Sequence, residues 1–377
     1  MTASEQADGQ AQRWVLQFCH GYDGPFLDCA RQYAVLFQGT SYKVCTVYLT
    51  GKPSVEVEQG SASDEVIFLD YSSAQVRGLK LGAIRDFRRI AASRDFALCI
   101  AHRFKPIYVA LLGSDLPVIG VHHAFGDYKR RSRQLFANFF RKRLALLGVS
   151  NAVRDDMRAC LPSWPVERIE TLYNRIDVEA VQAEQVSREA AREHLGLPQE
   201  AWVVGNVGRL HPDKDQATLI RGFAQALPQL PAGSLLAIMG RGRLEAQLKA
   251  LAAELGVSDA VCFLGQVPNG RRYFKAFDVF VLSSDHEPFG MVLLEAMAAG
   301  VPVLASDCGG AREVVDAAAN RFPLGSNDAL AQRLLYCASP SSSAREEHVP
   351  QRFSDAAARE HFWSLQMLAD LRSVLLK

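Results

Sequence analysis

Short apolar runs alternate with longer amphipathic segments along most of the chain. Such runs, separated by helical patterns, indicate parallel strands whose two faces are both covered by helices. The runs predict strands at 14–18, 43–49, 65–69, 96–102, 117–123, 144–150, 169–174, 202–210, 235–240, 261–265, 279–284 and 302–306. The amphipathic segments predict helices that include 76–92, 151–160, 181–195, 214–227, 243–255, 290–299, 326–338 and a C-terminal pattern at 353–371.

This pattern divides in two near residue 177. The stretch "LPSWPVERIETLYNRIDVEA" (161–180) contains two prolines and a turn-like Asn-Arg-Ile-Asp sequence. A length of 377 residues also favours two domains. We therefore predict an α/β protein with two doubly wound, Rossmann-like domains, 1–177 and 178–377, which face a cleft. Ligands of such sheets bind outside the carboxyl ends of the strands.

Charge is distributed unevenly between the halves. Residues 1–177 contain 23 Lys and Arg against 18 Asp and Glu, whereas residues 178–377 contain 19 against 23. This asymmetry indicates different partners for the two halves, and the net charge of +1 argues against a nucleic-acid partner. The polar N-terminus is unlike a signal peptide, no apolar run reaches 18 residues, and the eight cysteines form no CxxC motif. We expect a cytoplasmic protein.

Two glutamates stand out in "SSDHEPFGMVLLEAMAAGVPVLASDCGG" (283–310). Glu287 lies in the loop that follows the strand at 279–284, and Glu295 interrupts an otherwise apolar helix that begins near Gly290. Burying an unpaired carboxylate is costly, so each needs a partner. A helix start at the carboxyl end of a strand binds anions well, through backbone N–H groups such as those of Phe289, Gly290 and Met291. The segment therefore predicts a site for a ligand with both phosphates and hydroxyls.

A second loop, "NVGRLHPDKD" (206–215), places Arg209 and Lys214 after another strand. A guanidinium and an ammonium group suit a diphosphate, because charge-assisted hydrogen bonds are the stronger ones. The string Asp213-Lys214-Asp215 is similar to a DxD metal-binding motif. The lysine between the two acids neutralises it, so we expect no metal.

These motifs resemble the retaining glycosyltransferases of the GT-B fold, family 4 (group 1). "EPFGMVLLEAMAAGVPVLAS" resembles the family's E-x7-E signature, "GRLHPDKD" its diphosphate loop and "LYNRID" its interdomain segment. "VCFLGQV" resembles the strand after which the backbone reads the base, here near Val267. The resemblance implies that Glu287 contacts the donor sugar, Glu295 the ribose, and Arg209 and Lys214 the leaving diphosphate. The sequence departs from the family at Asp215 and Arg175, where glycine is usual.

The same resemblance implies that the C-terminal helical pattern crosses back onto the first domain. It also implies two features of the first half. A glycine-rich turn after the first strand approaches the donor phosphates, and the matching residue here is Gly24 in "HGYDGPFLDCA". A strand-end histidine faces the donor sugar, and His122, His123 and His102 are the candidates. Alternation along the strand sends His122 and His123 to opposite faces, so only one can face the sugar. We favour His122.

The segment 128–147 is strongly basic and contains three interleaved phenylalanines but no acidic residue. It suits an anionic membrane surface or an anionic acceptor; packing of the phenylalanines against the core is the alternative. Its basic residues are Lys129, Arg130, Arg131, Arg133, Arg141, Lys142 and Arg143.

Taken with the resemblance, the sequence predicts a retaining, metal-independent hexosyltransferase that needs no cofactor. The donor would be a nucleotide diphosphate sugar, UDP-linked in the first instance. The acceptor would be a cell-surface glycan such as lipopolysaccharide core, reached from the cytoplasmic face of the inner membrane. The alternatives are another GT-B enzyme, such as a sugar-nucleotide epimerase or a phosphorylase, and a non-catalytic subunit of a glycan assembly complex.

Overall fold

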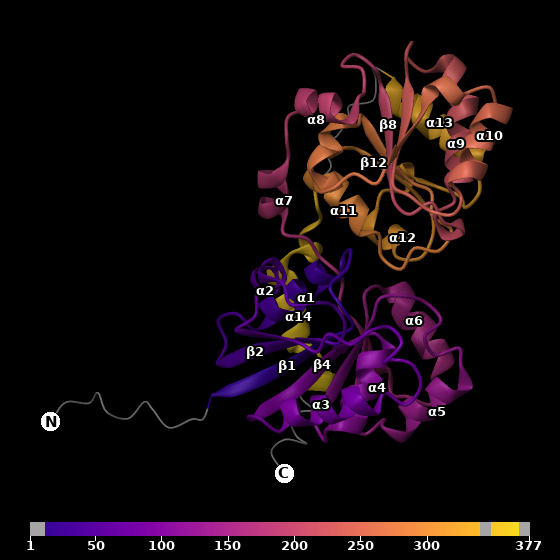
Figure 1. The fold of residues 1–377 in the computed structure, drawn as a ribbon. Coiled ribbons are helices and arrows are strands. Elements are labelled where there is room, and N and C mark those ends of the chain that lie inside the picture. The colour runs from indigo at the N-terminus through magenta and orange to yellow at the C-terminus, as the bar shows by residue number, and fades with distance from the viewer. Residues whose placement is uncertain (1–11, 340–347, 369–377) are drawn as a thin grey trace. The chain divides into compact units, whose positions relative to one another are not determined.

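The computed structural model describes residues 12–339 and 348–368 (Figure 1). The polar N-terminal stretch and the last residues of the C-terminal helical pattern lie outside these ranges. The described chain forms two compact units. Unit 1 comprises the residues up to Asn174 together with those from Asp355 onward, and unit 2 comprises Arg175–Ser354.

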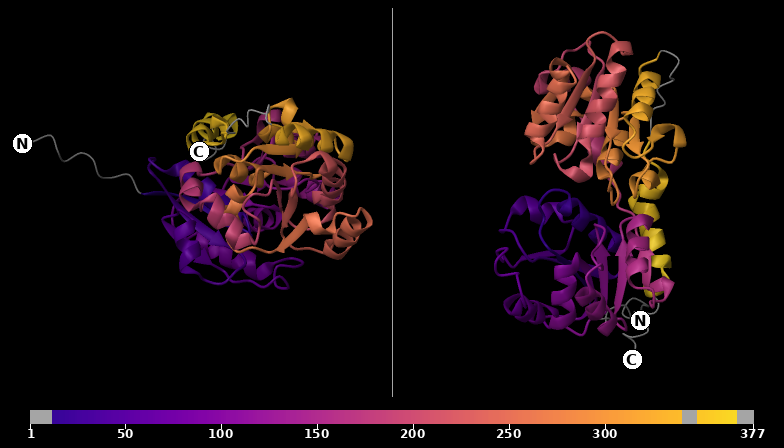
Figure 2. Two further views of the ribbon diagram at one scale, coloured as in Figure 1. Left: turned by 90° about the horizontal axis from the view of Figure 1, so that it is seen from above. Right: turned by 90° about the vertical axis from the view of Figure 1, so that its right-hand side faces the viewer.

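Unit 1 is built on a seven-stranded parallel sheet with the order β3-β2-β1-β4-β5-β6-β7. Its strands are β1 (Arg13–Cys19), β2 (Tyr42–Tyr48), β3 (Glu65–Phe68), β4 (Phe96–His102), β5 (Val118–His122), β6 (Leu144–Gly148) and β7 (Ile169–Thr171). Every strand expected in this half is present. The inner strands are buried because helices cover both faces of the sheet (Figure 2).

The helices of unit 1 fall between most of its strands, as the sequence pattern predicts, and the helix expected at 151–160 is confirmed. They are α1 (Phe26–Ala34), α2 (Val55–Gly60), α3 (Leu81–Ala91), α4 (Phe104–Gly113), α5 (Arg131–Phe139), α6 (Asn151–Cys160) and α14 (Asp355–Ser364), with short 3-10 turns η1 (Val35–Phe37) and η2 (Val166–Arg168). The predicted helix at 76–92 begins only at Leu81, because Lys80 adopts a left-handed conformation with φ of 55°. None of the described helices is long and apolar enough to span a membrane.

The last helix, α14, belongs to unit 1, as the resemblance implies. Phe362 and Trp363 pack edge-on against Phe37, with ring centroids 5.7 and 5.5 Å apart. Asp355 pairs with Arg31 at 3.2 Å. The predicted domain 178–377 is therefore wrong in its last part, because these contacts place the helix in unit 1. The first boundary lies at 174/175, three residues before the expected position.

Unit 2 contains a six-stranded parallel sheet with the order β10-β9-β8-β11-β12-β13. Its strands are β8 (Val203–Val207), β9 (Leu235–Met239), β10 (Val261–Gly265), β11 (Val279–Leu282), β12 (Val303–Ser306) and β13 (Arg321–Phe322). The five longer strands confirm the prediction. β13 was not predicted, since a two-residue strand leaves no pattern.

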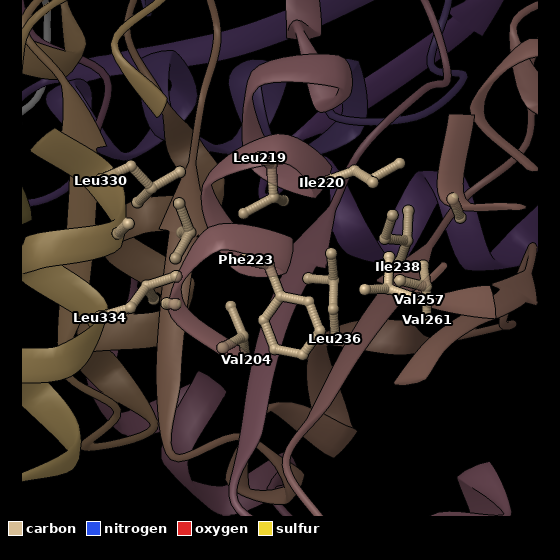
Figure 3. Packing of buried hydrophobic residues seen from close by; sticks show 14 of the residues in the cluster. Val204, Leu219, Ile220, Phe223, Leu236, Ile238, Val257, Val261, Leu330 and Leu334 are labelled. Carbon is tan, nitrogen blue, oxygen red and sulfur yellow. The ribbon is translucent and has the colours of Figure 1, made fainter. Parts of the chain in front are cut away.

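Helices cover this second sheet too. They are α7 (Val178–Glu184), α8 (Arg188–Leu195), α9 (Gln216–Ala226), α10 (Glu245–Glu254), α11 (Met291–Ala298), α12 (Ala311–Val314) and α13 (Asn327–Ala338), with 3-10 turns η3 (Pro212–Lys214), η4 (Leu227–Gln229), η5 (Ser258–Ala260), η6 (Gly270–Ala276), η7 (Ala318–Asn320) and η8 (Gln351–Phe353). Leu219 and Phe223 of α9 are fully buried in a cluster with Val204, Leu236 and Leu330 (Figure 3). This core fixes the strands whose ends carry the site.

Candidate functional site

The candidate site of unit 2 lies where β8 and β11 end. These neighbouring strands mark the point at which the chain order of the sheet reverses, since β9 and β10 lie on one side and β12 and β13 on the other. Ligands of open parallel sheets bind outside the carboxyl ends of the strands at such a switch point. The loops that follow the two strands, 208–215 and 283–290, are those that the sequence singled out.

Lys214 and Glu287 form an ion pair at the centre of this site. Lys214 Nζ lies 2.6 Å from Oε2 of Glu287, and Ser284 Oγ donates to the same oxygen at 3.1 Å. Glu287 is only 7% exposed and Ser284 is fully buried. A charge in such surroundings needs a partner. The partner of Glu287 in this structure is Lys214, which the sequence pattern assigns to a different loop.

Backbone contacts hold the two loops together. The N–H of Asp285 donates to the carbonyl of Asp213 at 3.1 Å, and Ser283 Oγ donates to the carbonyl of Lys214 at 3.0 Å. The carbonyl of Ser284 accepts from Cys308 Sγ at 3.1 Å. The loop of the cation and the loop of the carboxylate are thus hydrogen-bonded to each other.

The Asp-Lys-Asp string has a structural role in this loop. Asp213 contacts His211 and lies 3.5 Å from Arg209. Asp215 caps α9: its carboxylate accepts from Thr218 Oγ1 at 2.6 Å and from the Thr218 N–H at 3.3 Å. Its φ is 42°, in the left-handed region that glycine adopts most readily, so the conformation itself would suit glycine. The aspartate adds the two capping hydrogen bonds that glycine could not make. Within the described residues, no cluster of three or more His, Cys, Asp or Glu could hold a metal.

Arg209 is the more exposed of the two cations that the sequence singles out, with 72% of its side chain exposed. Its single ion-pair partner among the described residues is Asp213, at 3.5 Å. Such an exposed pair contributes little to stability. Arg209 can therefore leave Asp213 for a stronger anion at small cost.

The turn before α11 is shaped by two close backbone approaches. Gly290 precedes the helix with a φ of 99°, which only glycine adopts readily. A Cβ on Gly310 would lie 2.3 Å from the carbonyl oxygen of Pro288, so this position also admits only glycine. The Phe289 side chain is buried against Phe353 with ring centroids 5.5 Å apart, so Phe289 can offer a ligand only its backbone.

Glu295 lies on the partly exposed face of α11. Met291 and Val292 share that face, whereas the other residues of the helix, except Glu295 itself, are buried. The sequence suggested a carboxylate inside an apolar helix. The structure places Glu295 one turn beyond Met291, on the side of α11 along which a ligand bound at the helix start would extend.

Further groups at the same edge were not singled out from the sequence. The loop after β9 carries Arg241 and Arg243, both exposed. Its backbone joins the loop after β8, since the Leu210 N–H donates to the Arg241 carbonyl at 3.1 Å. A Cβ on Gly240 would lie 1.9 Å from the carbonyl oxygen of Gly208. The signal in the sequence that could have identified this loop is the pair of glycines in "MGRG" (239–242), because such close approaches admit only glycine.

Val267, the predicted base contact, is half-buried in the loop after β10. A Cβ on Gly270 in the same loop would meet Sδ of Met239 at 2.6 Å and Cβ of Val267 at 3.9 Å. Val267 thus lies near the end of β9, on the edge that carries Arg209 and Lys214.

The histidines of unit 1 separate as strand alternation predicts. His122 is fully buried, with Nδ1 2.7 Å from Asp127 and Nε2 3.1 Å from Tyr128. His123 turns the other way, and its Nε2 lies 3.2 Å from Nδ1 of His102. Burial lowers the pKa of His102 to about 3, and burial, then the neighbouring His102, lowers the pKa of His123 well below 6.5. Both rings are neutral at physiological pH.

Gly24 lies in the turn between β1 and α1 with a φ of 62°. Nothing lies within 4 Å of the position that its Cβ would occupy. The close approach in this turn occurs at Gly21, where a Cβ would meet Thr50 Oγ1 at 2.8 Å.

The basic segment divides into exposed and structural residues. Only 131–139 is helical, and the end of the segment is strand β6. Arg133 pairs with Asp127 at 2.6 Å, and Arg143 donates to the carbonyls of Leu111, Ser114 and Leu116. The other five basic residues are exposed: Lys129, Arg130, Arg131, Arg141 and Lys142. Phe136 packs inward on Tyr108, as the alternative predicts, whereas Phe139 is 81% exposed.

Two doubly wound units, each with a parallel sheet and helices on both faces, define a fold of the GT-B class. Residues 187–346 match the family model for glycosyl transferases group 1, and residues 38–180 match the model for glycosyltransferase family 4. The chain belongs to the glycosyltransferases of the GT-B fold.

Curated relatives match over part of their length. An uncharacterized glycosyltransferase of Methanocaldococcus jannaschii is 33% identical over 178 residues, which are 45% of this chain and 44% of that protein. The lipopolysaccharide core biosynthesis glycosyltransferase LpsE of Rhizobium meliloti is 42% identical over 115 residues, 30% of this chain and 32% of LpsE. The matched stretches thus span less than half the length of these relatives.

A solved structure shares the whole fold. The structure of HepE from Anabaena in complex with UDP and glucose has a TM-score of 0.73 and 21% sequence identity. The likeness covers 96% of this chain and 100% of that one. It extends the match of the family models to the complete two-unit architecture.

Proposed function

We propose that this protein is a retaining, metal-independent glycosyltransferase. It moves a hexose from a nucleotide diphosphate sugar, UDP-linked, to a hydroxyl of a cell-surface glycan such as lipopolysaccharide core. The observation that carries the proposal is the Lys214–Glu287 pair at the switch point of unit 2, beside Arg209 and the start of α11. Cations suited to a diphosphate and a carboxylate suited to hydroxyls meet there on two loops that are hydrogen-bonded to each other.

The cations act on the leaving group. As the bond between the anomeric carbon and the diphosphate breaks, negative charge grows on the diphosphate and the sugar gains oxocarbenium character. Lys214, Arg209 and the first N–H groups of α11 stabilise that charge, and fixed groups of this kind supply a large share of catalysis. They do the work that a divalent cation performs in metal-dependent transferases.

The carboxylates position the donor. Lys214 and Ser284 both engage Oε2 of Glu287, and no donor among the described residues engages Oε1, which is the oxygen offered to a sugar hydroxyl. Glu295, on the open face of α11, binds the ribose. The backbone near Val267 reads the base. In unit 1, His122 contacts the sugar, which requires that a sugar hydroxyl replace Tyr128 at Nε2.

Two comparisons support the choice of donor and acceptor. HepE, whose fold this chain shares, was crystallised with UDP and glucose. LpsE, by its name, acts in lipopolysaccharide core biosynthesis. The first supports a UDP-sugar donor, and the second supports a glycan acceptor.

We also propose a peripheral contact with the anionic cytoplasmic face of the inner membrane. The exposed cations of the segment 129–142 flank two exposed apolar side chains, Leu135 at 70% and Phe139 at 81%. Apolar groups beside exposed cations suit an anionic bilayer surface, where each cation contributes about 1 kcal/mol. Such a contact would bring the enzyme to lipid-linked acceptors.

Thermal unfolding against a panel of UDP-, GDP- and ADP-sugars tests the donor. A ligand at 100 times its Kd adds about 2.7 kcal/mol of stability, so the UDP-sugars should give the largest shift in Tm. Mass spectrometry with donor alone separates the alternatives, since an epimerised donor would overturn the transferase proposal. With acceptor present, proton NMR of the product should show the anomeric configuration of the donor; inversion would refute retention.

A further inference from the structure

A group of cations lies at the switch point of unit 1. The chain order of that sheet reverses between β1 and β4, so the loops after these two strands flank the switch point. Arg103 directly follows β4, and Lys105 lies in the first turn of α4. Lys80 directly precedes α3. This helix leads into the parallel strand β4, so it begins at the same edge of the sheet. Arg77 lies three residues before Lys80.

Two of these cations contact aromatic rings, and Lys80 Nζ also donates to the Gly78 carbonyl at 2.6 Å. Among the described residues, no carboxylate pairs with Arg77, Lys80, Arg103 or Lys105. The Arg103 guanidinium instead lies 5.0 Å from the centroid of the Phe26 ring, and Lys80 Nζ lies 4.6 Å from that of Tyr108. An aromatic face attracts a cation but leaves its net charge available to a ligand.

The arrangement is unfavourable for the protein alone. Lys80 and Arg103 occupy the N-cap positions of α3 and α4, where the helix dipole repels a cation, and both have positive φ values, 55° and 73°. Burial, then the charges of Arg103 and Arg77, lowers the pKa of Lys105. Burial, then Lys105 and Arg133, lowers the pKa of Lys80. A bound anion would relieve every one of these repulsions.

Two imidazoles at the same edge have unused nitrogens. His20 follows β1, and its buried Nδ1 has no hydrogen-bond partner among the described residues. His102 ends β4 and is 3% exposed, and its Nε2 likewise has no partner there. Burial, then Arg103 and Lys105, lowers the pKa of His20 to about 4, so this ring is neutral and can donate a hydrogen bond. The edge therefore offers donors as well as charge.

We propose that Arg77, Lys80, Arg103 and Lys105 form an anion site that binds a phosphate group of the acceptor. A phosphate ester or diphosphate carries enough charge to match several cations, and guanidinium groups bind phosphate oxygens in a bidentate manner. The donor diphosphate has its own cations in unit 2, around Lys214. The assignment of the phosphate to the acceptor rests on the proposed function, but the existence of the anion site does not.

Isothermal titration with inorganic pyrophosphate tests the site on the full chain at low salt. The background is Arg209→Gln/Lys214→Gln, which removes the diphosphate cations of unit 2. Pyrophosphate should still bind in this background, and adding Arg103→Gln/Lys105→Gln should raise its Kd at least tenfold. Adding Arg85→Gln/Arg89→Gln instead should change the Kd less than twofold. That control removes two positive charges from the outer face of α3, where both side chains are about 80% exposed.

The remaining outcomes overturn the proposal. If the background variant binds no pyrophosphate, the cations of unit 2 account for all binding. If both pairs of substitutions weaken binding equally, general charge and not a site is responsible. The Arg103→Gln/Lys105→Gln protein should unfold at the same temperature as its parent or higher, because repulsion has been removed, so loss of binding cannot be ascribed to unfolding.

A separate assay keeps this inference distinct from the proposed function. If no sugar is transferred from any donor, the proposed function fails while the titration still tests the anion site. If transfer occurs, a phosphorylated glycan acceptor and its phosphatase-treated form should differ in kcat/KM at least tenfold with the parent enzyme. The difference should disappear with Arg103→Gln/Lys105→Gln; if it persists, the phosphate of the acceptor binds elsewhere. Soluble and lipid-linked phosphorylated acceptors, tested side by side, identify the source of the phosphate.

Discussion

Lys214 and Glu287 are 73 positions apart in the chain, yet Lys214 Nζ lies 2.6 Å from the Glu287 carboxylate. The contact joins the loops of the two strands that flank the switch point of unit 2. Each residue holds the other in a fixed orientation before any ligand binds. A diphosphate that approaches Lys214 therefore meets a cation already placed, and a hydroxyl that approaches Glu287 meets a carboxylate already held in position.

Replacing Glu287 by alanine should lower transfer at least a hundredfold in kcat/KM. The substitution removes the acceptor for the sugar hydroxyl and also lets Lys214 move, which together correspond to about 2.7 kcal/mol of transition-state stabilisation. Steady-state transfer assays measure the effect. Glu254→Ala, an exposed glutamate at the end of α10, is the matched control and should keep full activity. An active Glu287→Ala enzyme would place the sugar contact elsewhere.

The ion pair should also be visible in stability. Glu287→Gln and Lys214→Met should each destabilise unit 2, because each leaves a largely buried charge without its partner. The double variant should lose less than the sum, with a coupling of about 0.5–3 kcal/mol. Native-state hydrogen exchange of the β11 amides measures this coupling in unit 2 alone. Additive losses would mean that the two charges interact with solvent and not with each other.

The strands and the two loops of the site could be predicted from sequence because each is local. An apolar run predicts a buried strand wherever it lies, and polar residues that follow it must reach the carboxyl edge. The pairing of Lys214 with Glu287 was not predictable in this way, since it depends on β8 and β11 being neighbours. Sheet order is set by the packing of the whole unit and leaves no trace in either loop.

The same limit explains the results in unit 1. Alternation along the strand correctly separates His122 from His123. It does not predict the partners of His122, because Asp127 and Tyr128 lie in the loop after β5, whose path the pattern leaves open. The uniform basic stripe of 128–147 divides because Arg143 meets the carbonyls at the end of α4, 27 to 32 residues earlier. Charge counted along the sequence cannot distinguish a cation that faces solvent from one that holds the backbone together.

Gly310→Ala should weaken donor binding at least tenfold. Its Cβ would lie 2.3 Å from the carbonyl oxygen of Pro288 and 2.5 Å from Cα of Phe289, so the turn that aims Glu287 must shift. We also expect a loss of stability of about 1–3 kcal/mol, as for other overpacked sites. Gly325→Ala is the control, because its φ of 67° costs stability while its Cβ would meet nothing within 4 Å. If titration with the nucleotide sugar shows equal Kd values for both variants, the turn does not position the donor.

Unit 1 should lose stability as the pH falls below about 6.5. The folded-state pKa of His102 is about 3 because of burial, whereas its ordinary value is 6.5. Between these values the unfolded chain binds the proton and the folded one does not, so the free energy of unfolding falls by up to about 1.4 kcal/mol per pH unit for this residue. Above pH 6.5 the His102 ring is neutral in both the folded and the unfolded chain, so protonation of this residue costs unit 1 no stability there. Hydrogen exchange of the β4 amides at several pH values measures the slope.

His102→Gln should reduce the dependence of the free energy of unfolding on pH. The reduction should correspond to at most one proton, about 1.4 kcal/mol per pH unit. His194→Gln, an exposed histidine of unit 2, should leave the slope unchanged. Equal slopes in the native protein and in His102→Gln would show that the folded state protonates this ring at little cost.

The two kinds of arginine in the basic segment should respond differently to substitution. Arg141→Gln/Lys142→Gln removes exposed cations, so we expect weaker flotation with anionic vesicles, little binding to zwitterionic ones, and an unchanged Tm. Arg143→Gln should instead lower stability by about 1–3 kcal/mol, because the carbonyls of Leu111, Ser114 and Leu116 lose their donor. Phe139→Ser should reduce vesicle binding without loss of stability, since its ring is exposed. Flotation that is insensitive to both anionic lipid and salt would exclude an electrostatic membrane contact.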